Sequence, residues 1–163
     1  MSDAGGTESR RVMCIGVGNL FRRDDGAGPA VLEQLRQRHV PGLQLLESSG
    51  EGATLITLWA GGDHVFLVDA ACSGRDPGTI YRIDAQENTL QPDFFYYSTH
   101  AFSVAEAVEL ARALDELPPR LIIYAVEGAD FGMGAALSAP VQAAVARVAD
   151  AIVREVDALL HGQ

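Results

Sequence analysis

Three segments of the sequence are apolar on both faces of a strand, and this feature constrains the fold most. They run from Val12 to Val17, from His64 to Asp69 and from Leu121 to Val126. A strand that is apolar on both faces has both faces buried, which is typical of a parallel sheet covered by helices. Helical patterns separate the three segments, and this alternation indicates the α/β class.

Helical periodicity predicts four helices and leaves two shorter strands. The helices open at the Gly26–Pro29 turn, near Glu51, at a capping box on Ser103, and at a Ser138 cap followed by Pro140. The shorter strands are predicted at 43–46 and, on a sheet edge, at 79–83. We therefore expect a three-layer α/β sandwich, with a mostly parallel, twisted sheet of about five strands and helices on both faces.

Length and composition support a single globular domain. The chain has 163 residues, 48% of them hydrophobic, which suits one domain of ordinary size. We expect residues 1–11 to form a flexible leader and residues 12–163 to form a single α/β domain. A net charge of -10 disfavours nucleic acid as a partner, because a phosphate backbone would be repelled. All 12 basic residues are Arg, so mechanisms that need a Lys amine are excluded.

The sequence also indicates a cellular compartment. The first 11 residues contain no apolar stretch suited to a signal sequence, and no apolar run approaches the roughly 20 residues of a membrane span. The two cysteines, Cys14 and Cys72, form no C-x-x-C pair, which favours a reducing environment. We expect a soluble, cytoplasmic protein that does not associate with a membrane.

Polar residues that follow the buried strands are the candidate site residues. In an open parallel sheet, ligands bind beyond the carboxyl ends of the strands, where the strand order reverses. Asp24 and Asp25 follow the first strand, and Asp69 ends the central one. His100 lies in a loop just before the Ser103 cap, and Glu127 follows the last apolar strand.

Each candidate also has a structural explanation. Asp24 or Asp25 can cap the helix that follows, Asp69 can bind neighbouring backbone, and His100 can be a turn residue. Glu127 can be structural, Cys72 can be a small buried hydrophobe, and His64 has the position of a surface residue. If two carboxylates and one imidazole do converge, their O and N ligands suit Zn, Ni or Fe and leave coordination positions open.

Other mechanisms lack their signatures. The sequence contains neither H-E-x-x-H nor G-x-S-x-G, so a helix-borne zinc protease and a serine hydrolase are both disfavoured. A dinucleotide fingerprint starting at Gly16 would need glycine at position 21, which is Phe21. Nucleotide binding by the loop at Gly18 is therefore a distant alternative.

The same residues resemble those of a known family. Ile15 to Gly28, with Gly18-Asn19, the acidic pair and Gly26-x-Gly28, resembles the [NiFe]-hydrogenase maturation endopeptidases. The resemblance continues through Val68-Asp69-Ala70 and Ser98-Thr99-His100, and extends to Leu137-Ser138. It covers nearly all of the chain from Val12 to the terminal helix.

The resemblance implies an endopeptidase that removes a C-terminal extension from the hydrogenase large-subunit precursor after nickel insertion. By position, the metal-binding and catalytic residues would be Asp25, Asp69 and His100, where many relatives have Glu at the first. Asn19, Asp24 and Glu127 would bind substrate. The nickel would be carried by the substrate and recognised as a checkpoint, and other divalent metals would be able to replace it.

Two points stay open in the sequence. Water can be activated by nickel that polarises the scissile carbonyl or by a carboxylate such as Asp25. The runner-up function is a noncatalytic adaptor that binds the hydrogenase precursor in a nickel-dependent way. The roles of Cys72 and Glu51 are not assigned.

Overall fold

The computed structural model describes residues 10–49, 52–96 and 103–162. Five strands form one sheet in the order β2-β1-β3-β5-β4. Their bounds are Val12–Val17 for β1, Leu43–Ser48 for β2, His64–Ala71 for β3, Ile80–Asp84 for β4 and Arg120–Glu127 for β5. Only β4 runs antiparallel, at one edge of the sheet. The predicted fold class is confirmed.

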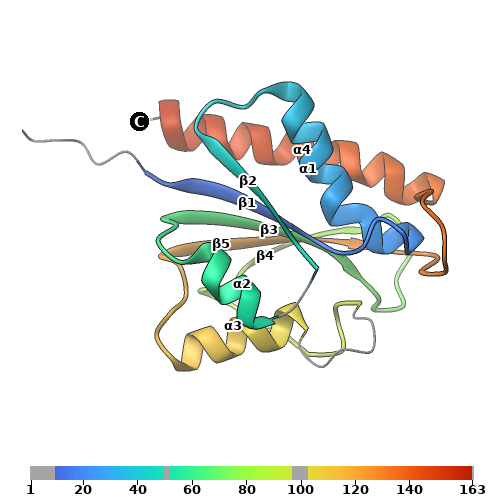
Figure 1. Ribbon diagram of the computed structural model, residues 1–163, viewed down its shortest axis with the longest axis horizontal. Coiled ribbons are helices and arrows are strands. Elements are labelled where there is room, and N and C mark those ends of the chain that lie inside the picture. The colour runs from blue at the N-terminus through green and yellow to red at the C-terminus, as the bar shows by residue number, and fades with distance from the viewer. Residues whose placement is uncertain (1–9, 50–51, 97–102, 163) are drawn as a thin grey trace, which may run out of the picture.

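Helices cover both faces of this sheet (Figure 1). The bounds are Ala27–Arg38 for α1, Gly52–Trp59 for α2, Val104–Ala113 for α3 and Ala139–His161 for α4. Helices α1 and α4 lie on one face and α2 and α3 on the other. A short 3-10 helix, η1 (Arg23–Gly26), precedes α1. Among the described residues, no helix is long and apolar enough to cross a membrane.

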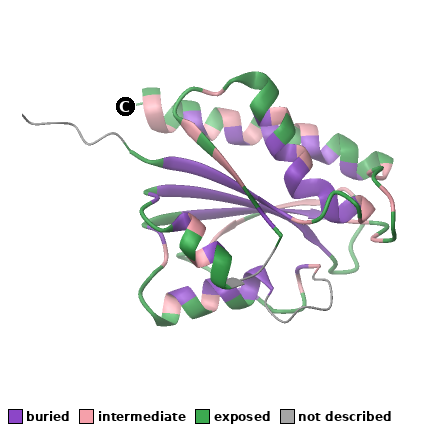
Figure 2. Ribbon diagram, viewed as in Figure 1, coloured by how far each residue is buried: buried purple, intermediate pink, exposed green. Residues whose placement is uncertain are grey.

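The pattern of burial explains why these segments form strands. Every residue of β1 and β3 is buried, as Figure 2 shows for the centre of the sheet. Alternate side chains supply two separate cores. Ile15 and Leu67 pack on the side of α2 and α3, whereas Cys14 and Phe66 pack on the side of α1 and α4. Both cores depend on the apolar residues that made these segments recognisable in the sequence.

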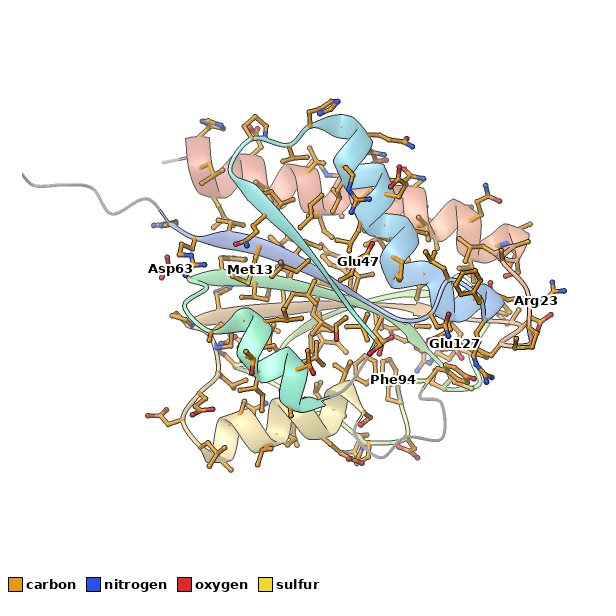
Figure 3. The ribbon with its side chains drawn as sticks, viewed as in Figure 1. Met13, Arg23, Glu47, Asp63, Phe94 and Glu127 are labelled. Atoms are coloured by element: carbon orange, nitrogen blue, oxygen red, sulfur yellow. The ribbon has the colours of Figure 1, made fainter. Side chains whose placement is uncertain are left out.

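The strand order predicts a binding crevice between β1 and β3. From β1 the chain continues to β2 on one side and later returns to β3 on the other, so the order reverses between these two strands. Ligands of such sheets bind at this point, beyond the carboxyl ends of the strands. Figure 3 shows Arg23 and Glu127 at that end of the sheet and Asp63 at the opposite end.

Several details of the prediction were wrong. Strand β3 continues to Ala71, so Asp69 lies inside the strand and not at its end. His64 is buried, and its ring lies 4.9 Å from that of Phe66, centroid to centroid. Arg11, assigned to the leader, already belongs to the folded part, since its N–H donates to the Asp63 carboxylate at 2.8 Å. Cys72 is exposed.

Candidate active site

Asp25 is held in η1, immediately after the loop that leaves β1. Its Oδ2 accepts a hydrogen bond from the Asn19 N–H at 3.0 Å, and the residue is only 7% exposed. Gly18 makes this position possible, because a Cβ on Gly18 would lie 1.9 Å from the Asp25 carbonyl oxygen. Burial raises the pKa of Asp25 to about 6, although the Asn19 N–H and the Arg22 charge oppose the increase.

Asp69 lies on the central strand and is 2% exposed. Its Oδ1 accepts a hydrogen bond from the N–H of Ala70 at 2.8 Å. Burial raises the pKa of Asp69 well above its usual range, and the negative charge of Asp25 raises it further. In addition, η1, which carries Asp25, packs against β3, so the two carboxylates lie on adjoining elements, as the metal hypothesis requires.

The free oxygens of this pair suit a cation. Within residues 10–49, 52–96 and 103–162, no group donates a hydrogen bond to Oδ1 of Asp25 or to Oδ2 of Asp69. Two buried carboxylates that are close together and only partly hydrogen-bonded repel each other, and a divalent cation would remove that repulsion. The donor set of the pair thus fits a divalent metal.

The third predicted ligand, His100, lies outside the described residues. The described residues stop before it at Tyr96, whose N–H donates to the carbonyl oxygen of Ala70, the residue after Asp69, at 3.1 Å. Among the residues that the structure describes, no group of three His, Cys, Asp or Glu side chains is arranged to hold a metal. The ligand assignment of Asp25, Asp69 and His100 stays a prediction.

Asp24 is fully buried and holds η1 against the loop after β5 and the start of α4. Its carboxylate accepts hydrogen bonds from the N–H groups of Ala129, Asp130 and Ser138, and from the Ser138 Oγ, at 2.7–3.0 Å. Burial alone would raise the pKa of Asp24, but these bonds lower it overall. Neither acid caps α1, whose N-cap is Gly26, so the capping alternative was wrong. Substrate binding by Asp24 stays a prediction.

Ser138 is the N-cap residue of α4, as predicted, but its side chain makes no capping bond to that helix. Its hydroxyl donates to Asp24 instead. The sequence offers no periodic signal for such a contact, since the two residues are more than a hundred positions apart. By contrast, the predicted cap on α3 is confirmed, with Ser103 Oγ accepting from the Glu106 N–H at 3.2 Å.

Glu127 anchors the loop that follows β3. Its Oε1 accepts from the N–H groups of Ser73 and Gly74 at 2.8 and 2.9 Å, and its Oε2 accepts from the Ser73 Oγ at 2.9 Å. These contacts fix the backbone just after Cys72 at the rim of the crevice. The structural explanation accounts for the contacts seen, and substrate binding by Glu127 stays a prediction.

Asn19 and Arg22 complete the described surroundings of Asp25. The Asn19 Oδ1 accepts from the Phe21 N–H at 2.9 Å, which tightens the loop, and the residue is exposed beside the carboxylates. Arg22 lowers the pKa of Asp25 through its charge, a role that the sequence analysis missed. The adjacency of two arginines to the acidic pair was the available signal.

Comparison with known proteins identifies relatives along most of the chain. The sequence profile of the hydrogenase maturation protease family matches residues 29–155. The hydrogenase 2 maturation protease of Escherichia coli K12 is 28% identical over 121 residues, which cover 71% of this chain and 72% of that protein. The hydrogenase expression/formation protein HupD of Thiocapsa roseopersicina is 29% identical over 126 residues, covering 74% of this chain and 57% of HupD.

The fold is also shared with solved structures. The hydrogenase maturating endopeptidase HybD from E. coli superposes with a TM-score of 0.74 at 25% sequence identity. The superposition covers 90% of this chain and 93% of HybD. The five-stranded, mostly parallel sheet and its covering helices therefore match an endopeptidase fold along nearly the whole chain.

Proposed function

Because the chain belongs to the hydrogenase maturation protease family, we propose that it removes the C-terminal extension of a [NiFe]-hydrogenase large-subunit precursor after nickel insertion. The observation that carries this proposal is that two buried carboxylates lie on adjoining elements, because η1, which carries Asp25, packs against β3, which carries Asp69, where the strand order reverses. The rest of the sheet end serves to hold that pair, through Gly18, Asn19 and Asp24.

In this proposal, nickel belongs to the substrate. Asp25 and Asp69 offer one oxygen each, His100 offers a ring nitrogen, and the precursor supplies the remaining ligands. Three protein ligands leave coordination positions for groups of the substrate, so a nickel-loaded precursor would bind and an empty one would not. Once the metal has positioned the precursor, water attacks the carbonyl carbon of the scissile peptide bond, and the amine of the C-terminal fragment leaves with a proton from that water.

Further residues have supporting roles in the proposal. The Asn19 side chain is exposed, so we assign it to contact with the precursor backbone, whereas Asp24 and Glu127 hold the loops against which the precursor lies. We also propose a cytoplasmic location, supported by the two free cysteines, Cys14 and Cys72.

Nickel-loaded and nickel-free precursors provide the test. We expect the wild-type protein to shorten only the nickel-loaded precursor, seen by intact mass spectrometry as loss of a C-terminal fragment. Asp69→Asn and His100→Ala should abolish the mass change. The matched control for the carboxylate is Asp157→Asn, because Asp157 is exposed on α4, away from the crevice, and this variant should cleave like wild type.

Each result has a clear reading. Cleavage that is equally fast without nickel would overturn the role of the metal. Nickel-dependent binding without any mass change would favour the adaptor function instead. A Asp69→Asn variant that cleaves at the wild-type rate would remove Asp69 from the site.

A further inference from the structure

Three large hydrophobic side chains are strongly exposed beside the candidate site. Leu20, Phe21 and Met133 are 50%, 69% and 74% exposed, and we call them the rim trio. Exposure of a single large side chain is common, but a group of them that buries nothing within its own fold marks an interaction site. The trio contributes little to folding, because most of its surface stays in water.

The trio forms one surface because two distant loops are tied together. The Gly134 N–H donates to the Phe21 carbonyl oxygen at 2.9 Å, and the Arg23 N–H donates to the Gly134 carbonyl oxygen at 2.8 Å. The Arg23 Nε also donates to the Met133 carbonyl oxygen at 3.3 Å. These bonds hold the loop after β1 against the loop after β5, so the trio keeps its arrangement without a partner.

The same loop fixes the trio relative to Asp25. Leu20 directly follows Asn19, whose N–H binds the Asp25 carboxylate, and the Leu20 backbone lies against Gly26, at the end of η1. Arg23 lies between Leu20 and Gly26 in the sequence. Figure 3 shows it at the same end of the sheet as Glu127. A polypeptide that reached the carboxylates would therefore pass close to the trio.

Polar groups border the trio. Arg22 and Arg23 follow Phe21 in the sequence, and Arg23 pairs with Asp130 across the two loops at 3.5 Å. An apolar centre with a charged border is the usual composition of a protein interaction surface. Because Arg22 and Arg23 both adjoin Phe21 on the first loop, an apolar segment without adjoining basic residues fits this surface best.

The exposed area of the rim trio indicates whether its binding partner is a short peptide segment or a second copy of the chain. Three partly exposed side chains offer on the order of a few hundred Å², whereas a stable dimer buries about 800 Å² on each partner. The area is enough for two or three side chains of an extended peptide whose main anchor lies elsewhere.

We propose that the rim trio binds apolar side chains of the precursor segment next to the scissile bond. This inference rests on the proposed function, in which the metal anchors the precursor at the carboxylates. The trio then adds binding energy on one side of that anchor and sets the direction in which the segment lies across the crevice.

Steady-state cleavage of nickel-loaded precursor by the double variant Phe21→Ser/Met133→Ser tests the proposal. We expect KM to rise about tenfold or more, because two apolar contacts are lost, while kcat stays within about twofold. The control is Leu114→Ser, since Leu114 is 55% exposed but lies at the far end of α3. Circular dichroism and thermal unfolding of both variants should agree with wild type within experimental error.

The affinity of the proteins for nickel-loaded precursor separates this proposal from the proposed function. If wild type binds the precursor but never cleaves it, the proposed function fails, and weaker binding by the double variant still supports the docking surface. An unchanged KM and unchanged affinity in the double variant would overturn the docking surface while leaving the protease intact. A wild-type dimer in sedimentation that the double variant converts to monomer would assign the trio to a second copy and overturn the proposal.

Discussion

Asp69 is a charged residue in a place that favours neutral ones. It lies on the central strand, it is 2% exposed, and the described structure gives its carboxylate one hydrogen bond, from the next residue in the chain. The charge of Asp25 adds to the cost of ionising it. A group kept in so unfavourable a state is a candidate for function, because stability alone would select against it.

Replacing Asp69 with Asn should therefore stabilise the metal-free protein while abolishing cleavage. The raised pKa of Asp69 means that the folded wild type loses stability as the pH rises above about 4 and through that pKa. Asn stays neutral at every pH, so it removes both the burial of a charge and the repulsion from Asp25. We expect Asp69→Asn to unfold in urea with a free energy about 1–3 kcal/mol above wild type at pH 8.

The pH dependence is the internal control for this prediction. Below about pH 4 Asp69 is protonated in both the folded and the unfolded state, so the advantage of Asn should shrink. An Asp69→Asn protein that is less stable than wild type at every pH would show that Asp69 is a structural residue.

Metal binding should release a proton from the same pair. Burial raises the pKa values of Asp25 and Asp69, so part of the pair is protonated near pH 6 before the metal arrives. A divalent cation binds the ionised form. Calorimetry with nickel in two buffers of different ionisation enthalpy should show proton release at pH 6 that declines as the pH rises. Proton uptake, or no buffer dependence at pH 6, would contradict the assignment of the pair.

Gly18 is a single residue that determines the position of Asp25. Its φ of 140° is unfavourable for other residues, and a Cβ would lie 1.9 Å from the Asp25 carbonyl oxygen. We expect Gly18→Ala to lower the free energy of unfolding by about 3 kcal/mol or more, because strain and overlap combine. Urea denaturation measures the change.

Gly74 provides a matched control for the backbone strain. It also has a positive φ, 86°, but among the described residues no atom beyond its chain neighbours lies within 4 Å of its Cβ position. Gly74→Ala should therefore lose only about 1–2 kcal/mol. Equal losses in the two variants would mean that the close approach of Gly18 to Asp25 does not matter.

At the scale of elements, Asp24 joins three parts of the chain. It belongs to η1, and it accepts bonds from the loop after β5 and from Ser138 at the start of α4. The same loop binds the η1 segment again, through the Asp24 N–H and the Asp130 carbonyl oxygen at 2.9 Å. The position of Asp25, the next residue, depends on these contacts.

Asp24→Asn should destabilise the protein, in contrast to Asp69→Asn. The amide has one oxygen, so at least one of the N–H groups that now bind Asp24 would face another donor, and we expect a loss of about 2–4 kcal/mol at pH 7. Because the pKa of Asp24 is lowered, its contribution is present above about pH 4 and is lost as the pH falls through the folded-state value. Urea unfolding at pH 7 and pH 3.5 would measure this, and a gap that widens at low pH would contradict it.

The elements were largely predictable and their polar contacts were not. Both-faces-apolar runs identified β1, β3 and β5 because burial on two sides leaves a local signature. The capping box on Ser103 was recognised because its partner is three residues away. Ser138 also precedes a helix, but its hydroxyl donates to Asp24, and this contact depends on a residue far away in the sequence.

At the scale of the whole molecule, the sequence predicted the general architecture but not the order of the strands in the sheet. Alternating strands and helices predicted two covered faces and a crevice at the carboxyl ends. The sequence did not reveal that Asp69 sits within β3, because an acid at the end of an apolar run looks like the first residue of a loop. It also did not reveal the contacts that bring Met133 to Phe21, since those are bonds between loop backbones.

The two cores should influence stability without changing the chemistry of the site. Ile152 of α4 is fully buried, so Ile152→Ala should lower the free energy of unfolding by about 2–4 kcal/mol. Cleavage per folded molecule should stay at the wild-type value, because this core lies under the helices and not at the sheet end. Arg154→Ala, on the exposed side of the same helix, is the control and should change neither quantity.

The contact between Asp24 and Ser138 has a consequence for the timing of biosynthesis. Residues 24 and 138 are separated by 114 positions, so the ribosome must translate most of the chain before η1 receives its anchor. A nascent chain from which only the first strands have emerged contains Asp25 and Asp69, but the positions of the two carboxylates relative to each other are not yet fixed. Proteolytic competence should therefore arise late and abruptly, when the last helix docks.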